Sequence, residues 1–110
     1  MIEDTIGKIE TRIQGTDSIN ESRRRELLQL LGTLKTEVAE LSKTHGEQAQ
    51  SIAGFAEVSA HEATRAERDP ELLKLSLAGL GSSASGFEQS HPRLVQIVSA
   101  ISNTLSNLGI

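Results

Sequence analysis

The sequence contains no cysteine, tryptophan or tyrosine, and its only phenylalanines are Phe55 and Phe87. Without cysteine, a disulfide framework and a thiolate metal site are both excluded, so the fold must depend on packing. Because aromatic side chains are enriched in strands, a core of Leu, Ile, Val and Ala with almost no aromatic residues favours packed helices. The composition therefore predicts an all-α protein.

Charged residues give a slight acidic excess, with 15 Asp and Glu against 11 Lys and Arg and a formal net charge of −4. An acidic surface disfavours general nucleic-acid binding. No apolar run approaches the roughly 20 residues of a membrane span, so no such span is expected. Glu3 and Asp4 stand where a signal peptide needs basic residues, and we therefore expect a cytoplasmic protein.

Apolar residues recur at spacings of three and four in five segments of the chain. They predict one domain over residues 1–110, with helices near 2–14, 19–45, 47–68, 70–89 and 92–108. Gly46 is expected to end the second of these helices, and the alternative is a single longer, bent helix over residues 19–68. We expect an antiparallel bundle of four to five helices with coiled-coil-like seams that self-associates.

Capping signals mark where three of these helices begin. Ser18 and Glu21 have the spacing of a capping box, in which the serine caps the helix that follows. Asp69 precedes Pro70, and Pro92 follows His91; proline suits the first position of a helix because its missing N–H is not needed there. The connections between helices are therefore expected to be short.

Small residues occupy the periodic positions of the third and fourth helices, which we expect to form an antiparallel hairpin around Asp69-Pro70. The predicted hairpin seam pairs Ala63 with Ser76, Ala60 with Gly79, Ala56 with Ser83, and Ala53 with Gly86. Glycine inside a helix costs about 1 kcal/mol relative to alanine, so a close approach of two backbones would explain it. The alternative is a loose or frayed fourth helix.

The last helix has the most regular apolar stripe and follows the last charged residue, Arg93. Because uncharged side chains are cheaper to bury, we expect this helix to be the most enclosed. The predicted contact stripe, which would bind a second copy or a partner helix, consists of Leu94, Val98, Ile101, Leu105 and Leu108, with Phe87 as an aromatic anchor. The alternative is that the stripe is intramolecular core.

The end of the chain carries a distinctive motif, Phe87-Glu88-x-x-His91-Pro92-x-Leu94, and closes with Leu105-x-x-Leu108-Gly109-Ile110. This motif resembles the ending of small uncharacterised bacterial helical proteins, the domain-of-unknown-function family 4404. The isoleucine-rich first helix and the helix from Arg25 to Leu41 resemble the first two helices of that family by pattern. The alanine-rich stretch from 46 to 69 looks like an insertion relative to shorter members. The resemblance implies a small bacterial helical fold and no known activity, cofactor or catalytic residue.

No arrangement of residues indicates catalysis or metal binding. His61-Glu62-x-x-Arg65 differs from the zinc motif H-E-x-x-H because arginine replaces the second histidine. His45 and His91 lie at expected helix ends, where histidine commonly serves a cap or the helix dipole. Gly79-x-Gly81 lacks the Lys-Ser/Thr of a phosphate loop. We therefore expect no enzyme, no metal and no cofactor.

The consecutive Arg23, Arg24 and Arg25 point about 100° apart on a helix, which indicates a solubilising face rather than a phosphate-binding one. The sequence as a whole predicts a non-enzymatic helical interaction or scaffold module that binds itself or a partner protein. The alternative is a peripheral protein that associates with lipid surfaces through amphipathic helices.

Overall fold

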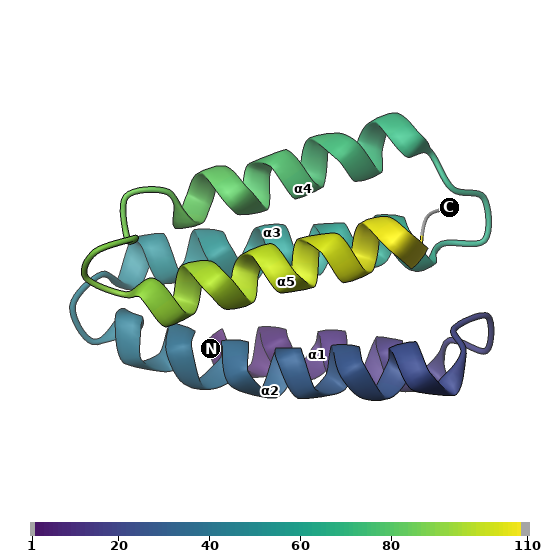
Figure 1. Ribbon diagram of the computed structural model, residues 1–110, viewed down its shortest axis with the longest axis horizontal. Coiled ribbons are helices and arrows are strands. Elements are labelled where there is room, and N and C mark those ends of the chain that lie inside the picture. The colour runs from purple at the N-terminus through teal and green to yellow at the C-terminus, as the bar shows by residue number, and fades with distance from the viewer. Residues whose placement is uncertain (1, 109–110) are drawn as a thin grey trace.

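The computed structural model describes residues 2–108, and over this range it contains five α-helices and no strand. The helices are α1 (Ile2–Gly15), α2 (Glu21–Ser42), α3 (Gly46–Thr64), α4 (Pro70–Ala84) and α5 (Pro92–Leu108). Successive helices run in opposite directions, with connections at alternating ends of the molecule (Figure 1). The expected all-α, antiparallel bundle is confirmed.

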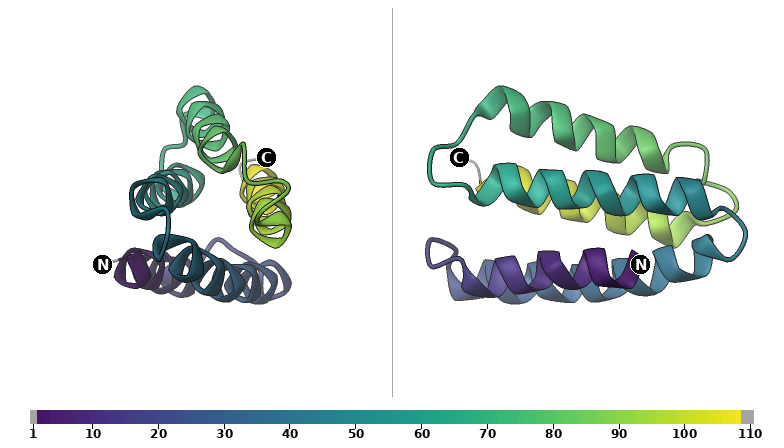
Figure 2. Two further views of the ribbon diagram at one scale, coloured as in Figure 1. Left: turned by 90° about the vertical axis from the view of Figure 1, so that its left-hand side faces the viewer. Right: turned by 180° about the vertical axis from the view of Figure 1, so that it is seen from behind.

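The helices form three layers, which the end view in Figure 2 shows most clearly. One layer holds α1 and α2, the next holds α3 and α5, and α4 lies alone across α3 and α5. Only α3 packs against all four other helices within the described range. Its buried face consists largely of alanine, and these small side chains let neighbouring helices approach from several sides.

The predicted apolar stripes of α1 and α2 form the core between the first two layers. In α1 the buried residues are Ile6, Ile9 and Ile13, and in α2 they are Leu27, Leu31, Leu34, Val38 and Leu41. Each set follows the helical spacing of three and four, so one face of each helix is buried while the other carries polar residues. The stripe alone is enough to predict which face lies inside.

Helix α2 ends at Ser42 and α3 begins at Gly46, so the alternative of one long, bent helix over residues 19–68 is wrong. Gly46 begins α3 rather than ending α2. The amide of His45 donates to the carbonyl of Leu41 at 2.8 Å, which closes the last turn of α2 before the chain reverses. The break is therefore made by the turn at residues 43–45, with glycine at the start of the next helix.

Asp69 caps α4 as predicted, because its carboxylate accepts hydrogen bonds from the amides of Glu71 (3.0 Å) and Leu72 (3.3 Å). The predicted cap at Ser18 is wrong. Asn20 caps α2 instead, and its side-chain oxygen accepts from the amide of Arg23 at 2.9 Å. The later start has a packing reason, since Ile19 is 5% exposed and is buried in the core ahead of the helix.

Two helices end earlier than their sequence patterns predict. Helix α3 ends at Thr64 instead of residue 68, since Arg65 is extended and Nε of Arg68 donates to the carbonyl of Ala63 at 3.1 Å. Helix α4 ends at Ala84 instead of residue 89, and Gly86 has the only positive φ among the described residues, 99°. This left-handed residue turns the chain towards α5 at low steric cost.

Candidate functional site

The predicted contact stripe of α5 lies inside the bundle and not on its surface. Leu94, Val98, Ile101 and Leu105 are each at most 2% exposed, while Phe87 and Leu108 are half-buried and pack against the core. The helix that carries them packs on α2, α3 and α4. The stripe is therefore intramolecular core in this structure, which corrects the expectation that it is exposed to a partner.

The predicted hairpin seam is only partly in register. Its four alanines, Ala53, Ala56, Ala60 and Ala63, are buried, as is Ser76; Ser83 is half-buried, and Gly86 lies outside α4 altogether. A Cβ atom at Gly79 would overlap the ring of Phe55, not a side chain at the predicted partner Ala60. Gly79 thus faces Phe55 instead of Ala60, a shift of about five positions along α3 from the predicted pairing. The shift follows from the earlier end of α3 at Thr64, which moves the centre of the hairpin turn.

The family motif builds a small aromatic cluster at one end of the bundle. The ring centroid of Phe87 lies 5.4 Å from the ring centroid of His45 and 5.7 Å from that of His91, and the rings pack edge to face in both pairs. His45 comes from the α2–α3 connection and His91 from the α4–α5 connection, so the cluster joins two neighbouring turns. Gly109 and Ile110, the last motif residues, lie outside the described residues.

Other motif residues shape the turn that the cluster closes. The carboxylate of Glu88 accepts a hydrogen bond from the amide of Gly86 at 2.9 Å. The carbonyl of His91 accepts from the amide of Val95 at 3.3 Å, just after Pro92 begins α5. Over residues 2–108, no three His, Cys, Asp or Glu side chains are arranged to hold a metal ion. The geometry of the motif is thus that of a structural turn.

The segment similar to a zinc motif carries an ion pair. Glu62 is only 7% exposed, and its carboxylate lies 3.0 Å from Nη1 of Arg65. Arg65 thus forms an ion pair with Glu62 from the position at which the zinc motif has its second histidine. Gly79 and Gly81 both lie within α4, as the apolar pattern of that helix predicts.

Arg24 has a role that the sequence does not reveal. Its guanidinium donates to the carbonyl oxygens of Ile13 (2.6 Å), Gln14 (3.2 Å), Thr16 (2.9 Å) and Ile19 (2.9 Å), and Nε donates to Glu21 (3.0 Å). Two of these carbonyls, those of Ile13 and Gln14, lie in the last turn of α1, where the helix itself supplies no amide partner. Arg24 thus fastens the α1–α2 connection, while Arg25 is exposed as expected of a solubilising residue.

Four large apolar side chains are exposed on the adjacent helices α3 and α4, and the sequence pattern did not predict them. They are Phe55 (40% exposed), Val58 (48%), Leu72 (43%) and Leu75 (65%), which we call the α3–α4 apolar surface. The stripe of α4 runs through Leu73, Leu77 and Leu80, so Leu72 and Leu75 fall outside it. That mismatch is the one signal in the sequence that could have indicated them.

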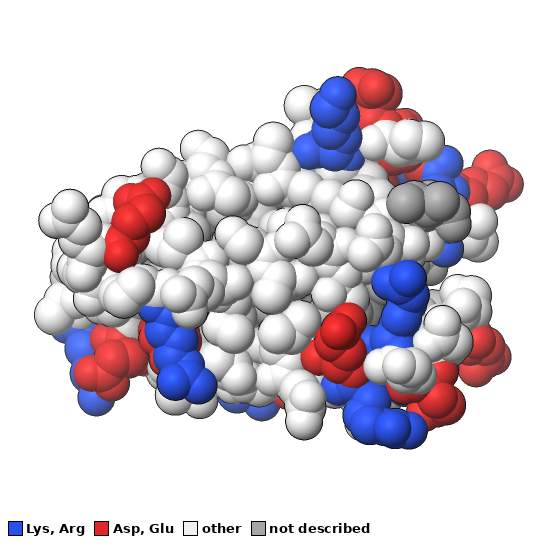
Figure 3. Space-filling model, viewed as in Figure 1, with Lys and Arg blue, Asp and Glu red and all other residues white. Residues whose placement is uncertain are grey.

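Charged side chains are sparse on the face where α4 and α5 lie in front. Figure 3 shows a broad uncharged area in the middle of this face, with acidic and basic residues along the lower edge and towards both ends. The described part of α5 has no charged side chain after Arg93. This face is therefore cheaper to remove from water than a face covered with Lys and Glu.

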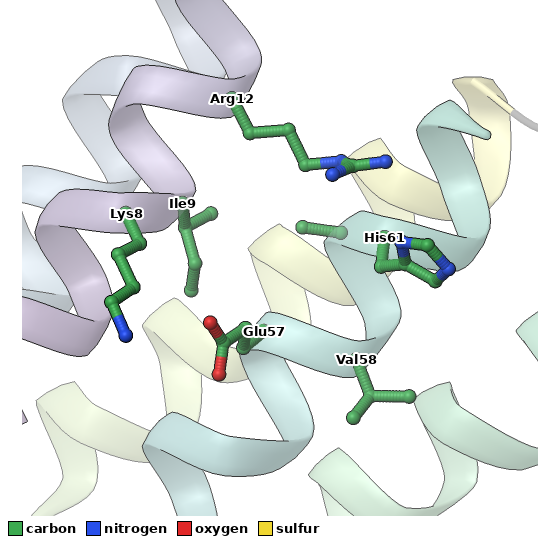
Figure 4. Close-up of a pocket in the computed structure, with 7 residues that line it drawn as sticks. Lys8, Ile9, Arg12, Glu57, Val58 and His61 are labelled. Atoms are coloured by element: carbon green, nitrogen blue, oxygen red, sulfur yellow. The ribbon is translucent and has the colours of Figure 1, made fainter.

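A cavity of about 360 Å³ opens between α1 and α3. It is lined by Lys8, Ile9 and Arg12 from α1 and by Glu57, Val58, Ala60 and His61 from α3. Figure 4 shows the long side chain of Arg12 reaching from α1 towards α3, where its Nε donates to Oγ1 of Thr64 at 2.7 Å. The cavity thus combines an apolar floor with two basic side chains.

A protein-family model described as a domain of unknown function (DUF4404) matches residues 27–110. The chain belongs to this family. The DUF4404 match begins at Leu27 in α2 and includes the C-terminal motif, whereas α1 precedes it. No curated protein and no solved structure gives a significant match.

The DUF4404 match assigns no function to any residue. Its span covers the central α3 and the isolated α4, and so it contains the whole α3–α4 apolar surface. Within residues 2–108, no helix is long and apolar enough to cross a membrane.

Proposed function

We propose that the protein is a non-enzymatic helical scaffold that self-associates through the α3–α4 apolar surface. The observation that carries this proposal is the exposure of four large apolar side chains on two adjacent helices, with Leu75 the most exposed at 65%. Single exposed apolar residues are ordinary, but a cluster of them marks an interaction site. In a dimer, this surface would be removed from water.

The surroundings of the α3–α4 apolar surface favour a protein partner. The neighbouring face of α4 and α5 carries few charged side chains (Figure 3). Charged residues are depleted at the centres of protein interfaces, because each must lose its water shell on binding. The uncharged face lies on the α5 side of α4, whereas Phe55 and Val58 lie on α3 on the other side (Figure 2), so a partner would have to reach over α4 to cover both.

The charges beside the apolar residues favour a second copy of the chain over a partner of one charge sign. Glu71 and Lys74 are exposed on α4, one helical turn apart and next to Leu72 and Leu75. In a two-fold pair of antiparallel α4 helices, each Glu71 can approach Lys74 of the other copy. Helices that lie on a membrane instead carry rows of Lys and Arg on the polar face, so the lipid-surface alternative has less support.

The test is the mass of the protein in solution, followed through dilution and detected by refractive index because tryptophan and tyrosine are absent. We expect a dimer, and we expect Leu75→Asp to be a folded monomer. Gln29→Asp on α2 is the matched control, since Gln29 is exposed on the far layer and gains the same charge. A wild-type monomer at high concentration would overturn the proposal, as would a Leu75→Asp variant that remains a dimer.

We also propose a bacterial, cytoplasmic setting. The family resemblance of the C-terminal motif supports the bacterial source, and the absence of cysteine is compatible with a reducing cytoplasm. In such a setting a cysteine-free bundle needs no oxidising compartment to fold.

A further inference from the structure

The cavity between α1 and α3 has an apolar floor. Ile9 and Ala60 are 3% and 1% exposed, and Val58 forms one of its walls. Its volume of about 360 Å³ lies at the lower end of the usual range for ligand pockets, roughly 300 to 1,000 Å³. Ile9 and Ala60 are already covered, so an apolar ligand would displace water mainly from Val58, which is 48% exposed.

The position of Arg12 over this floor is fixed by a second residue. Its Nε donates to Oγ1 of Thr64 at 2.7 Å, and that hydroxyl donates in turn to the carbonyl of Ala60 at 2.7 Å. The guanidinium is therefore held by its inner nitrogen. The two terminal Nη groups keep their donors for another partner, in the fork that matches a carboxylate.

Neither Arg12 nor Lys8 is neutralised by an acidic side chain within ion-pair distance in the described chain. Two cations elsewhere in the bundle are paired in this way: Lys35 lies 2.7 Å from the carboxylate of Glu10, and Arg65 lies 3.0 Å from that of Glu62. The cavity thus keeps positive charge beside an apolar floor. That combination suits an anion with an apolar tail.

We infer that the α1–α3 cavity binds a small organic carboxylate with a short apolar tail. The carboxylate accepts two hydrogen bonds from the Nη groups of Arg12, and the tail packs on Ile9, Ala60 and Val58. Figure 4 shows Glu57 and Arg12 on different sides of the cavity. The negative charge of Glu57 disfavours the reverse orientation, so the ligand has one preferred direction.

The probe for this site is hexanoate, titrated into 15N-labelled protein and followed by NMR amide shifts. We expect saturable shifts in residues 8–12 and 57–64, with a dissociation constant in the millimolar range. Hexylamine has the same tail and the opposite charge, and it is expected to cause no saturable shift there. If the cavity recognised only the apolar tail, hexanoate and hexylamine would cause equal amide shifts, which would contradict the inference.

Variants separate the charge of Arg12 from its positioning. We expect Arg12→Gln to weaken hexanoate binding at least ten-fold, because it removes a charged, bidentate hydrogen bond. A ten-fold loss corresponds to about 1.4 kcal/mol. Thr64→Val keeps the charge but removes the residue that holds it, and we expect a loss of about three-fold. Arg25→Gln, an exposed arginine on α2, is the control and should leave binding unchanged.

The inference fails if hexanoate gives no saturable shift, if its shifts lie elsewhere, or if Arg12→Gln binds it as well as the natural sequence does. Val58 belongs to both the α3–α4 apolar surface and the cavity wall, but Arg12, Ile9 and Ala60 lie outside that surface, so the monomeric Leu75→Asp variant should still bind hexanoate. Loss of hexanoate binding in a folded Leu75→Asp variant would also contradict it, since that residue does not line the cavity.

Discussion

The ring of Phe55 on α3 lies so close to Gly79 on α4 that a Cβ atom at position 79 would overlap it. The glycine is thus part of the contact surface between the two helices. Phe55 is 40% exposed, so its ring has solvent on one side and can move outward. The cost of adding a side chain at position 79 therefore depends on whether this ring is present.

Gly79→Ala tests this relationship. Alanine stabilises a helix by about 1 kcal/mol relative to glycine, but here the gain is offset by displacement of the Phe55 ring. We expect the free energy of unfolding to change by less than about 1 kcal/mol in the natural sequence. In a Phe55→Ala background, the same substitution should stabilise by about 1 kcal/mol.

Urea unfolding followed by far-ultraviolet circular dichroism measures both values, and the four proteins form a double-mutant cycle. Gly81→Ala is the control, because a Cβ atom there meets nothing within 4 Å. It should stabilise equally in both backgrounds. Equal effects of Gly79→Ala with and without Phe55 would show that the two residues do not interact.

Periodic spacing was sufficient to predict five helices and the buried faces of α1, α2 and α5. It did not predict where α3 and α4 end, because their ends depend on contacts made outside the helix. Arg68 reaches back to a carbonyl of α3, and Gly86 takes a left-handed conformation that the pattern of small residues had placed inside a helix. These ends shift the register of the α3–α4 hairpin.

A stripe also cannot reveal what covers it. The spacing of Leu94, Val98 and Ile101 is the same for a helix in a bundle as for one facing a second chain, and here α2, α3 and α4 cover it. The exposed surface instead involves Phe55 and Leu75, which break the pattern of their helices. Arg12 and Thr64 are 52 positions apart, so only the fold brings them together.

Ser59 provides a second test, of polar burial in the central helix. Its side chain is fully buried on α3, and its hydroxyl has no hydrogen-bond partner within the described chain. Burying an unpaired hydroxyl costs about 1 to 3 kcal/mol. We therefore expect Ser59→Ala to stabilise the protein by roughly 1 kcal/mol or more, in the same urea experiment.

Ser76 on α4 is the matched control for this substitution. It is 5% exposed, and its hydroxyl donates to the carbonyl of Leu73 at 2.9 Å. Ser76→Ala removes a hydroxyl that is already paired, so its gain should be smaller. A Ser59→Ala variant that is less stable than the natural protein would show that this hydroxyl has a partner after all.

Arg24 tests the connection between α1 and α2. The side chain of Arg24 is 15% exposed and its guanidinium donates to several backbone carbonyls, so Arg24→Met removes these hydrogen bonds. We expect a loss of about 2 to 3 kcal/mol in the free energy of unfolding. Arg24→Lys should recover little, because one ammonium group cannot reach all of these carbonyls.

The control is Arg25→Met, which removes the same charge at an exposed position. It should change stability by less than about 0.5 kcal/mol. Hydrogen exchange at the end of α1 gives a second measurement, since local opening there should increase only in the Arg24 variants. Equal losses in both arginine variants would mean that net charge, not the hydrogen bonds, is responsible.

Ile101 tests the finding that the α5 stripe is intramolecular core. Its side chain is 1% exposed, and aspartate there would bury an unpaired charge. We expect Ile101→Asp to cost at least about 4 kcal/mol and to abolish cooperative unfolding. Ser99→Asp adds the same charge to an exposed position of α5, so this control should stay folded, with a loss below about 1 kcal/mol. Circular dichroism melts of both variants and their masses in solution are the measurements. An Ile101→Asp variant that stays folded and becomes monomeric would contradict the expectation and place an oligomer seam on α5. A charge at position 101 is compatible with a folded chain only if the stripe is open to solvent once the chains separate.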